Sequence, residues 1–186
     1  MKYLLCAFLL ITGCASVNPQ KDCNFEKNVF GQRVAWAGPI TFYIHPSVPE
    51  KFYNEIADAA DTWNVVLGRK FITVAPPAPR DRPSLNIIYF EENWDRDIHT
   101  QAYTTNIWFG NRYFHSAIIV NYDYYRFIGG QHDLDLKSLM IHEFGHALGL
   151  KHMAEPSVMD AYLGHGEIRH ELNKIDIESV ICEYRR

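Results

Sequence analysis

The chain has 186 residues, of which 47% are hydrophobic and 14% aromatic, and its formal net charge is −4 at pH 7. These values exclude an intrinsically disordered chain and predict one domain large enough to bury a substantial core. The charges are spread without acidic or basic blocks, which argues against a nucleic-acid partner and against a polybasic membrane patch.

The N-terminus departs from this globular composition. Lys2 is followed by an apolar run from Tyr3 to Ile11 in the sequence MKYLLCAFLLITGCAS. The run is shorter than the ~20 residues that a transmembrane helix needs, and a basic residue before a short apolar run is typical of a secretory signal. We therefore predict that residues 1–13 are a signal peptide and that the protein is exported.

The end of this signal, Ile11-Thr12-Gly13-Cys14, resembles the lipobox of bacterial lipoproteins. The resemblance implies that the signal is cleaved before Cys14, which then carries a lipid that anchors the protein to the membrane. Ala15 and Ser16 differ from the aspartate associated with inner-membrane retention. An outer-membrane lipoprotein is therefore expected, facing the periplasm or the cell surface. The alternative is an ordinary signal peptide followed by a cysteine that occurs there by chance.

The remaining cysteines agree with export. Cys6 lies inside the signal and Cys14 is the lipidation candidate, which leaves Cys23 and Cys182. In an oxidising compartment we expect this pair to form a disulfide that joins the N-terminal segment to the last helix. The alternative is two separate buried thiols.

Residues 14–35 show little periodicity and are predicted to be a tether, so that the domain spans 36–186. Its first half combines strand patterns, rich in β-branched and aromatic residues, with one pattern of helical period. Ser47 and Glu50 have capping-box spacing at the start of that helix, and Gly68 stands where a C-terminal glycine belongs. The predicted elements are a strand at 40–45, a helix at 47–68, a strand at 71–75 and a proline-rich loop at 76–83.

Further strands are predicted at 85–90 and 117–122. The first is apolar enough for a sheet strand that is covered on both faces. Between them, residues 91–116 contain scattered aromatic side chains and show no clear period, so no element is assigned there.

Two helices are predicted in the last third of the chain. One begins at the cap residue Asp135 and runs to Leu148, with apolar residues on more than one face, so we expect it to be largely buried. The other has Asn173 as its cap and Asp176 in its first turn.

Three histidines and one glutamate occur within the stretch HEFGHALGLKH of the first of these helices. Residues four apart share a helix face, so His142 and His146 can direct imidazole nitrogens at one point. Glu143 points to the side, where a carboxylate can reach a metal-activated water without being a ligand. Gly149 can adopt a positive φ and turn the chain back, which brings in His152 as a third ligand. Three protein ligands leave a fourth position open, as in catalytic zinc sites.

The pattern His-Glu-x-x-His alone is loose, and the alternative is a structural histidine cluster with satisfied hydrogen bonds. Gly149 and His152 at the required offsets favour the metal, because the helix otherwise buries histidines without partners. We therefore expect one catalytic Zn²⁺ held by His142, His146 and His152.

The same stretch resembles the extended zinc signature of the metzincin metalloproteases, and Met159 in SVMD resembles their Met-turn, an apolar floor beneath the zinc ligands. Within this clan the chain is most similar to the matrixin catalytic domain. The resemblance implies an α+β fold of the α/β-type metzincin domain: a twisted, mostly parallel sheet with an antiparallel edge strand, packed on two long helices, and a small C-terminal subdomain that ends in a helix. It also implies that His142, His146 and His152 are zinc ligands, Glu143 the catalytic base and Met159 the turn methionine.

The chain departs from the matrixin pattern in several places. Matrixins follow their Met-turn with an aromatic residue and a proline, whereas this chain has Asp160 and Ala161, so the resemblance does not extend to the wall of the specificity pocket. Tyr162 lies three residues after the methionine, not two as in clan members with a tyrosine ligand, and we assign it to the pocket wall. We expect no pro-domain, because too few residues lie between Cys14 and the first predicted strand. Cys23 as a zinc-blocking thiol is a further alternative, but its surroundings, KDCNFE, do not match a cysteine switch.

A second zinc or a structural calcium, like those in matrixins, has several candidate ligands: His99, His115, His132, His165, His170, Asp133 and Asp135. Their spacing matches no known ligand pattern, which favours the alternative that they are ordinary surface residues.

Together these features predict a monomeric, zinc-dependent endopeptidase that cleaves a peptide or protein substrate. We expect the substrate to lie extended along a sheet edge within residues 102–122, bound through main-chain hydrogen bonds. One alternative is a zinc-stabilised lipoprotein that binds a peptide without turnover, against which the retained Glu143 argues. The other is zinc-dependent hydrolysis of a non-peptide amide.

Overall fold

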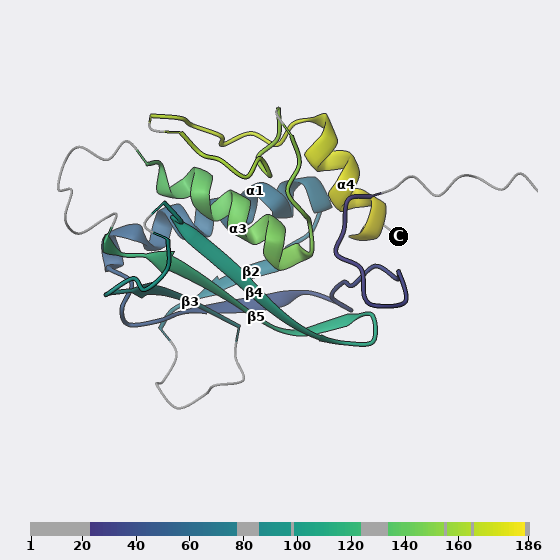
Figure 1. The fold of residues 1–186 in the computed structure, drawn as a ribbon, viewed down its shortest axis with the longest axis horizontal. Coiled ribbons are helices and arrows are strands. Elements are labelled where there is room, and N and C mark those ends of the chain that lie inside the picture. The colour runs from purple at the N-terminus through teal and green to yellow at the C-terminus, as the bar shows by residue number, and fades with distance from the viewer. Residues whose placement is uncertain are drawn as a thin grey trace, which may run out of the picture.

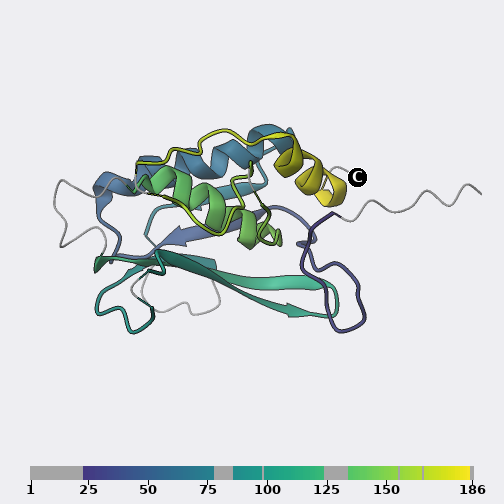
Figure 2. The same ribbon diagram turned by 45° about the horizontal axis from the view of Figure 1, so that its top comes forward.

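A twisted sheet forms one layer of the molecule and helices form the other (Figure 1). The computed structural model describes residues 23–77, 86–97, 99–123, 134–154, 156–164 and 166–184. Within these residues the helices α1 (Tyr53–Leu67), α3 (Leu136–Leu148) and α4 (Lys174–Tyr184) lie on the same side of the sheet, as Figure 2 shows from a second direction.

In the described part of the chain the sheet has the strand order β2-β1-β3-β5-β4. β1 (Ile40–Ile44) pairs in parallel with β2 (Ile72–Ala75) and with β3 (Asn86–Glu91), and β3 pairs in parallel with β5 (Arg112–Asn121). β4 (Ala102–Phe109) runs antiparallel to β5 at the edge. The predicted fold class, a mostly parallel sheet with an antiparallel edge strand packed on helices, is therefore confirmed.

Strands β4 and β5 form a hairpin that the sequence pattern does not indicate. β4 lies wholly within 91–116, where no element is predicted, and β5 begins at Arg112 instead of at residue 117. The residues of β4 are exposed or half-buried throughout, so the strand lacks the alternation that marks one buried face. A β-bulge between Ile107 and Trp108 also shifts its register.

Helix α1 begins later than the capping-box spacing predicts. A short 3₁₀ helix, η1 (Glu50–Phe52), precedes it, and Pro49 at the N-cap of η1 makes no side-chain hydrogen bond. The Ser47 hydroxyl accepts a hydrogen bond from the Phe90 amide of β3 at 3.0 Å, so it joins this connection to the sheet and does not cap the helix. The capping-box prediction is therefore wrong. Gly68 ends α1 with a φ of 64°, as predicted.

The N-terminal segment, Cys23–Trp36, packs on the domain although most of it is predicted as a tether. Phe25 and Val34 are fully buried, and the Glu26 amide donates to the Gly149 carbonyl at 2.8 Å. In the structure Cys23 forms a disulfide with Cys182 of α4, and the two Cα atoms are 6.1 Å apart. The described part of the predicted tether thus belongs to the folded domain. Its few apolar residues fill space beside α3 and α4, which periodicity does not reveal.

The core lies between the sheet and the helices α1 and α3. Phe42 of β1 meets Phe144 of α3 edge to face, with ring centroids 5.5 Å apart. Trp63 of α1 is fully buried, and its indole N–H donates to the Ile141 carbonyl of α3 at 2.9 Å. Burial of each such side chain contributes about 1.5–3 kcal/mol, so α3 is firmly held on its core side. Among the described residues, no helix has the length and apolar character needed to span a bilayer.

Candidate metal centre

Helix α3 carries His142, Glu143 and His146, and it lies where the sequence predicts. The Asp135 side chain caps its N-terminus by accepting the Ser138 amide at 2.7 Å. The helix ends at Gly149, whose φ of 102° lies in the left-handed region. A Cβ at this position would also come within 3.1 Å of the rings of Phe25 and Tyr113. Only glycine meets both requirements, and the chain turns back here as expected.

The N-terminal segment holds the chain that returns from Gly149. The Lys151 amide donates to the Asn24 carbonyl at 3.0 Å, and the Asn24 side chain donates to the carbonyls of Lys151 and His152 at 3.1 Å each. Asn24 therefore fixes the backbone that presents His152. Sequence reasoning missed this residue because its partners are backbone atoms up to 128 positions away.

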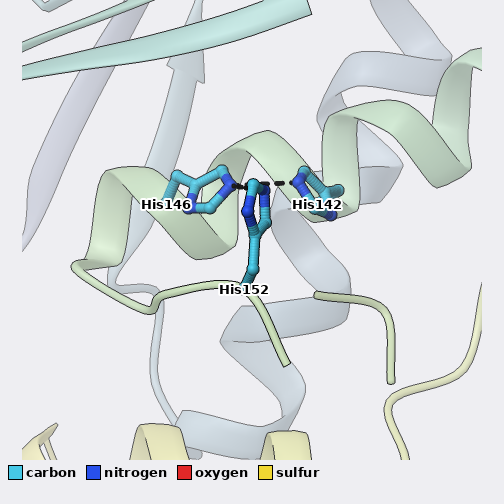
Figure 3. A group of neighbouring side chains, drawn as sticks. All are labelled: His142, His146 and His152. Atoms are coloured by element: carbon cyan, nitrogen blue, oxygen red, sulfur yellow. Dashed lines mark hydrogen bonds between the residues drawn. The ribbon is translucent and has the colours of Figure 1, made fainter. Parts of the chain in front are cut away.

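The imidazoles of His142, His146 and His152 face one another (Figure 3). Nε2 of His146 lies 3.0 Å from Nε2 of His142 and 3.1 Å from Nε2 of His152. Three nitrogens bound tetrahedrally to zinc at about 2.0 Å would lie about 3.3 Å apart. Two of the three separations lie close to this value, and the ligand nitrogens of all three rings lie within 4.8 Å of one another, so the cluster can hold one small cation.

Backbone carbonyls fix the tautomer of two of these rings. Nδ1 of His142 donates to the Val158 carbonyl and Nδ1 of His146 donates to the Leu150 carbonyl, each at 2.8 Å. A neutral imidazole has a single N–H, so each Nε2 keeps a lone pair directed at the centre. Burial lowers the pKa of His142 to about 3 and the pKa of His146 to about 4, which keeps both rings neutral at pH 7. Lone pairs this close repel unless a cation lies between them, so the residues fit a zinc ion.

Glu143 lies beside the histidine cluster and is only 3% exposed. The Thr104 hydroxyl of β4 donates to Oε2 of Glu143 at 2.6 Å. Burial raises the pKa of Glu143 to about 7, and the hydrogen bond from Thr104 acts in the opposite direction. Sequence reasoning missed Thr104 because it belongs to the strand that shows no periodic signal.

Met159 lies against α3 and is fully buried. A Cβ on Gly145 would collide with Sδ of Met159, so the glycine between the histidines lets the methionine approach the helix. The turn before Met159 is held by Asp176 of α4, which accepts hydrogen bonds from the Ser157 hydroxyl at 2.5 Å and the Val158 amide at 3.2 Å. The sequence predicts Asp176 only as a first-turn residue of the last helix. Its contact with the turn is an additional role.

A cleft of about 650 Å³ opens over the histidines. Strand β4 forms one wall with Thr104, Asn106 and Trp108, and residues 160–163 form part of the other. Arg169 supports the second wall by donating to the Tyr162 carbonyl at 2.7 Å. Tyr162 thus lines the cleft, in the place assigned to it, and the sheet edge beside the cleft is β4, within the predicted range.

The candidates for a second metal do not assemble in the part of the chain that the structure describes. There, His142, His146 and His152 are the only group of three or more potential ligands that lie together. His170 and Asp135 form a pair, with Nε2 and Oδ1 2.6 Å apart. Three further candidates, and the lipidation candidate, lie outside the described residues: His132, Asp133, His165 and Cys14.

Comparison with known proteins agrees with this geometry. The sequence model of one family, described as Matrixin, matches residues 22–185. No curated protein matches the chain. The family match spans the sheet, the helix that carries His142 and His146, and the closing helix. Matrixins use a catalytic zinc, which the cluster of three histidines fits. The chain therefore belongs to the matrixin family of zinc metalloendopeptidases.

Proposed function

We propose that the protein is a lipid-anchored endopeptidase in which His142, His146 and His152 hold the catalytic zinc and Glu143 is the general base. The observation that carries this proposal is the convergence of three Nε2 atoms beside a buried carboxylate in one cleft. Such a group of residues is the donor set of a catalytic zinc site with an adjacent base.

Zinc, when bound, supplies Lewis-acid chemistry that polarises the scissile carbonyl and lowers the pKa of the attacking water. Glu143 takes the proton from this water and later delivers it to the leaving amine, as the peptide bond breaks. Thr104 holds Oε2 of Glu143 and so leaves Oε1 to accept the proton. The hydrogen bonds from the histidine Nδ1 atoms to backbone carbonyls keep both rings oriented throughout.

The proposed substrate is an extended peptide that adds to the edge of the sheet. β4 is the last strand in the sheet order and also lines the cleft, so main-chain hydrogen bonds along it bring a peptide bond over the histidines. Residues 160–163 on the opposite wall then contact the substrate side chains and contribute to selectivity.

Substitution of the proposed base tests the mechanism. We expect Glu143→Gln to lower kcat for cleavage of an unfolded protein by about 10²–10⁴-fold, because a positioned base contributes that much to a proton transfer. The zinc content, measured by elemental analysis, stays unchanged because Glu143 is not a ligand. His146→Ala is the matched control and loses the metal.

Unchanged turnover of Glu143→Gln contradicts the assignment of the base. A digest of a peptide library by the wild-type protein, with and without chelator, addresses the alternatives. If the zinc-loaded protein cleaves no peptide, it is a peptide-binding lipoprotein or acts on another amide. A cell-wall substrate assayed beside the library distinguishes these two.

We also propose that a lipid on Cys14 anchors the domain to the outer membrane. The short apolar run and the lipobox-like Ile11-Thr12-Gly13-Cys14 support this. Mass spectrometry of the mature protein is expected to find an acylated Cys14 as the first residue, and Cys14→Ser is expected to lose the lipid. A mature chain with an unmodified cysteine contradicts the anchor.

A further inference from the structure

Large apolar side chains are exposed at one end of the sheet. Val29, Phe30 and Phe109 are 94%, 83% and 85% exposed, and Ile107, Trp108 and Phe114 are each more than 40% exposed. We call these six residues the hairpin patch. Single exposed apolar residues are ordinary, but several gathered at one end of a molecule mark an interaction site.

The two halves of the hairpin patch are held together. The Asn28 side chain donates to the Gly110 carbonyl at 3.0 Å, which joins the N-terminal loop to the turn between β4 and β5. The Ala35 amide donates to the Asn111 carbonyl at 3.1 Å, and the Tyr113 amide donates to the Ala35 carbonyl at 3.2 Å. Figures 1 and 2 both show the purple N-terminal loop beside this turn. The two segments that carry the patch are therefore joined by hydrogen bonds.

The two stretches that carry the hairpin patch contain basic residues but no acidic ones. The stretches KNVFGQR (27–33) and TNIWFGNRYFH (105–115) contain Lys27, Arg33 and Arg112 but no aspartate or glutamate. Arg33 is paired with Glu183 at 3.2 Å, and the Arg112 guanidinium donates to the Trp36 carbonyl at 3.5 Å. The side chains of Lys27 and Arg112 are exposed. Aromatic residues flanked by basic ones are typical of surfaces that insert at the headgroup level of an anionic bilayer.

The described chain begins at the same end of the molecule as the hairpin patch. Cys23 follows Cys14 by nine positions, and at about 3.4 Å per position the two residues are at most about 30 Å apart. The disulfide to Cys182 fixes where this segment joins the domain, and the loop with Val29 and Phe30 follows directly. In both ribbon views the described N-terminus and the hairpin turn lie at one end.

We propose that the hairpin patch is a membrane-docking surface that lies against the anionic leaflet in which the lipid on Cys14 is anchored. The proposal rests on the proposed lipidation. Docking orients the catalytic domain, because Trp108 belongs both to the patch and to the wall of the cleft. The cleft then opens beside the bilayer, and its substrates are protein segments close to the membrane surface.

Tryptophan fluorescence tests this orientation. The chain has four tryptophans, of which Trp36 and Trp63 are buried. Trp108 pairs with Tyr113 near the start of β5, whereas the Trp94 amide donates to Asp123, just beyond the end of β5. Asn121 lies eight positions after Tyr113 in β5, which is about 25 Å along the strand, so Trp94 serves as a matched control at the far end of the sheet.

The lipidated full chain is placed in phosphatidylcholine–phosphatidylglycerol vesicles with brominated acyl chains, which quench tryptophan on contact. We expect quenching in the wild type and in Trp94→Phe, and its loss in Trp108→Phe. Phe109→Asp and Phe30→Asp are expected to reduce the quenching at least twofold. Val65→Asp, at a residue of α1 that is 79% exposed, leaves it unchanged. Vesicles of phosphatidylcholine alone are expected to give weaker quenching.

Quenching that persists in Trp108→Phe, or that is lost in Trp94→Phe, overturns the proposal. A Phe109→Cys variant that forms disulfide-linked dimers, together with an absence of quenching in the wild type, also overturns it, because the patch is then a contact between two chains. The mass of the N-terminus reports the anchor separately. If no lipid is present, the unlipidated full chain and its variants are added to the same vesicles and their tryptophan quenching is compared. Absence of quenching in that experiment overturns the docking proposal.

Discussion

Thr104 and Glu143 join the edge strand to the helix of the metal centre. The Thr104 hydroxyl donates to Oε2 of Glu143 at 2.6 Å and lies 3.2 Å from the Glu143 carbonyl oxygen. A hydrogen bond to a charged group contributes about 1.5–3 kcal/mol, and a general base acts only within hydrogen-bond reach of the proton that it takes. Thr104 is therefore a positioning residue for the proposed base.

Removal of the Thr104 hydroxyl is expected to slow the chemical step. Thr104→Val should lower kcat by about 10–100-fold, the equivalent of the lost hydrogen bond, with little change in KM. Thr104→Ser keeps the donor and should retain most of the activity. Steady-state kinetics with an unfolded protein substrate measures both, and elemental analysis checks that zinc is retained. Equal kcat values for the two variants contradict the positioning role.

Three residues along α3 determine where the helix begins, where it ends and how closely its neighbour packs. Asp135 begins it, Gly149 ends it with a left-handed φ, and Gly145 lets Met159 pack against it. These features act together, because the Met159 turn also supplies the Val158 carbonyl that orients His142. The packing of one glycine therefore affects the metal centre.

Gly145→Ala separates helix propensity from packing. In an exposed helix this substitution stabilises by about 1 kcal/mol, but here the new methyl group would meet Sδ of Met159 and lie 3.1 Å from the Trp63 ring. We expect the free energy of unfolding to fall by about 1–3 kcal/mol, as for an overpacked core, and zinc affinity to weaken. Urea unfolding and zinc titration measure these effects. Adding Met159→Ala to the Gly145→Ala variant removes the side chain that collides with the new methyl group and should recover part of the stability. If no stability is recovered, the collision is not the cause of the loss.

The cap of α3 gives a stability term that depends on pH. Burial tends to raise the pKa of Asp135, but hydrogen bonds from Ser138 and the contact with His170 outweigh it and lower this pKa below the ordinary value of 3.8. Since the pKa is lower in the folded state, the stabilisation is present above pH 3.8 and is lost as pH falls through the folded pKa.

Asp135→Ala should therefore lower the free energy of unfolding by about 1 kcal/mol at pH 7, as for other lost N-caps. Urea unfolding of both proteins from pH 7 to pH 2.5 is expected to show this difference shrinking below pH 4, because the protonated Asp135 is a weaker acceptor. Both proteins lose the metal in acid, so the difference between the wild type and Asp135→Ala at each pH excludes that contribution to stability. A difference that grows as the pH falls contradicts the assignment.

At the scale of the whole molecule, the two ends of the domain support the metal centre jointly. The disulfide joins Cys23 to Cys182 across 159 positions, and Asn24, the next residue, holds the backbone of His152. Asp176 of α4 holds the turn before Met159 in the same way. Segments distant in sequence thus form the floor beneath the histidines.

The disulfide is expected to stabilise this arrangement. The double substitution Cys23→Ser and Cys182→Ser should lower the free energy of unfolding by about 2–5 kcal/mol and weaken zinc binding, because Asn24 loses its fixed neighbour. Urea unfolding and zinc titration measure both. A reductant should lower the stability and zinc affinity of the wild type and leave those of the double variant unchanged. A wild type whose stability is insensitive to reductant contradicts the role of the disulfide.

The candidate metal centre along α3 was predictable from residue spacing, and the broad fold class followed from the resemblance to matrixins. The helix repeat fixes which residues share a face, so His142, Glu143, His146 and the turn at Gly149 follow from spacing alone. The folded structure was needed to find β4, the packing of the N-terminal segment, and the contacts of Asn24, Thr104 and Asp176. These residues act on partners between 18 and 128 positions away, and an exposed edge strand has no buried face to produce a pattern. Sequence periodicity reflects which face of a helix or strand a residue occupies, whereas contacts between elements form only when the chain folds.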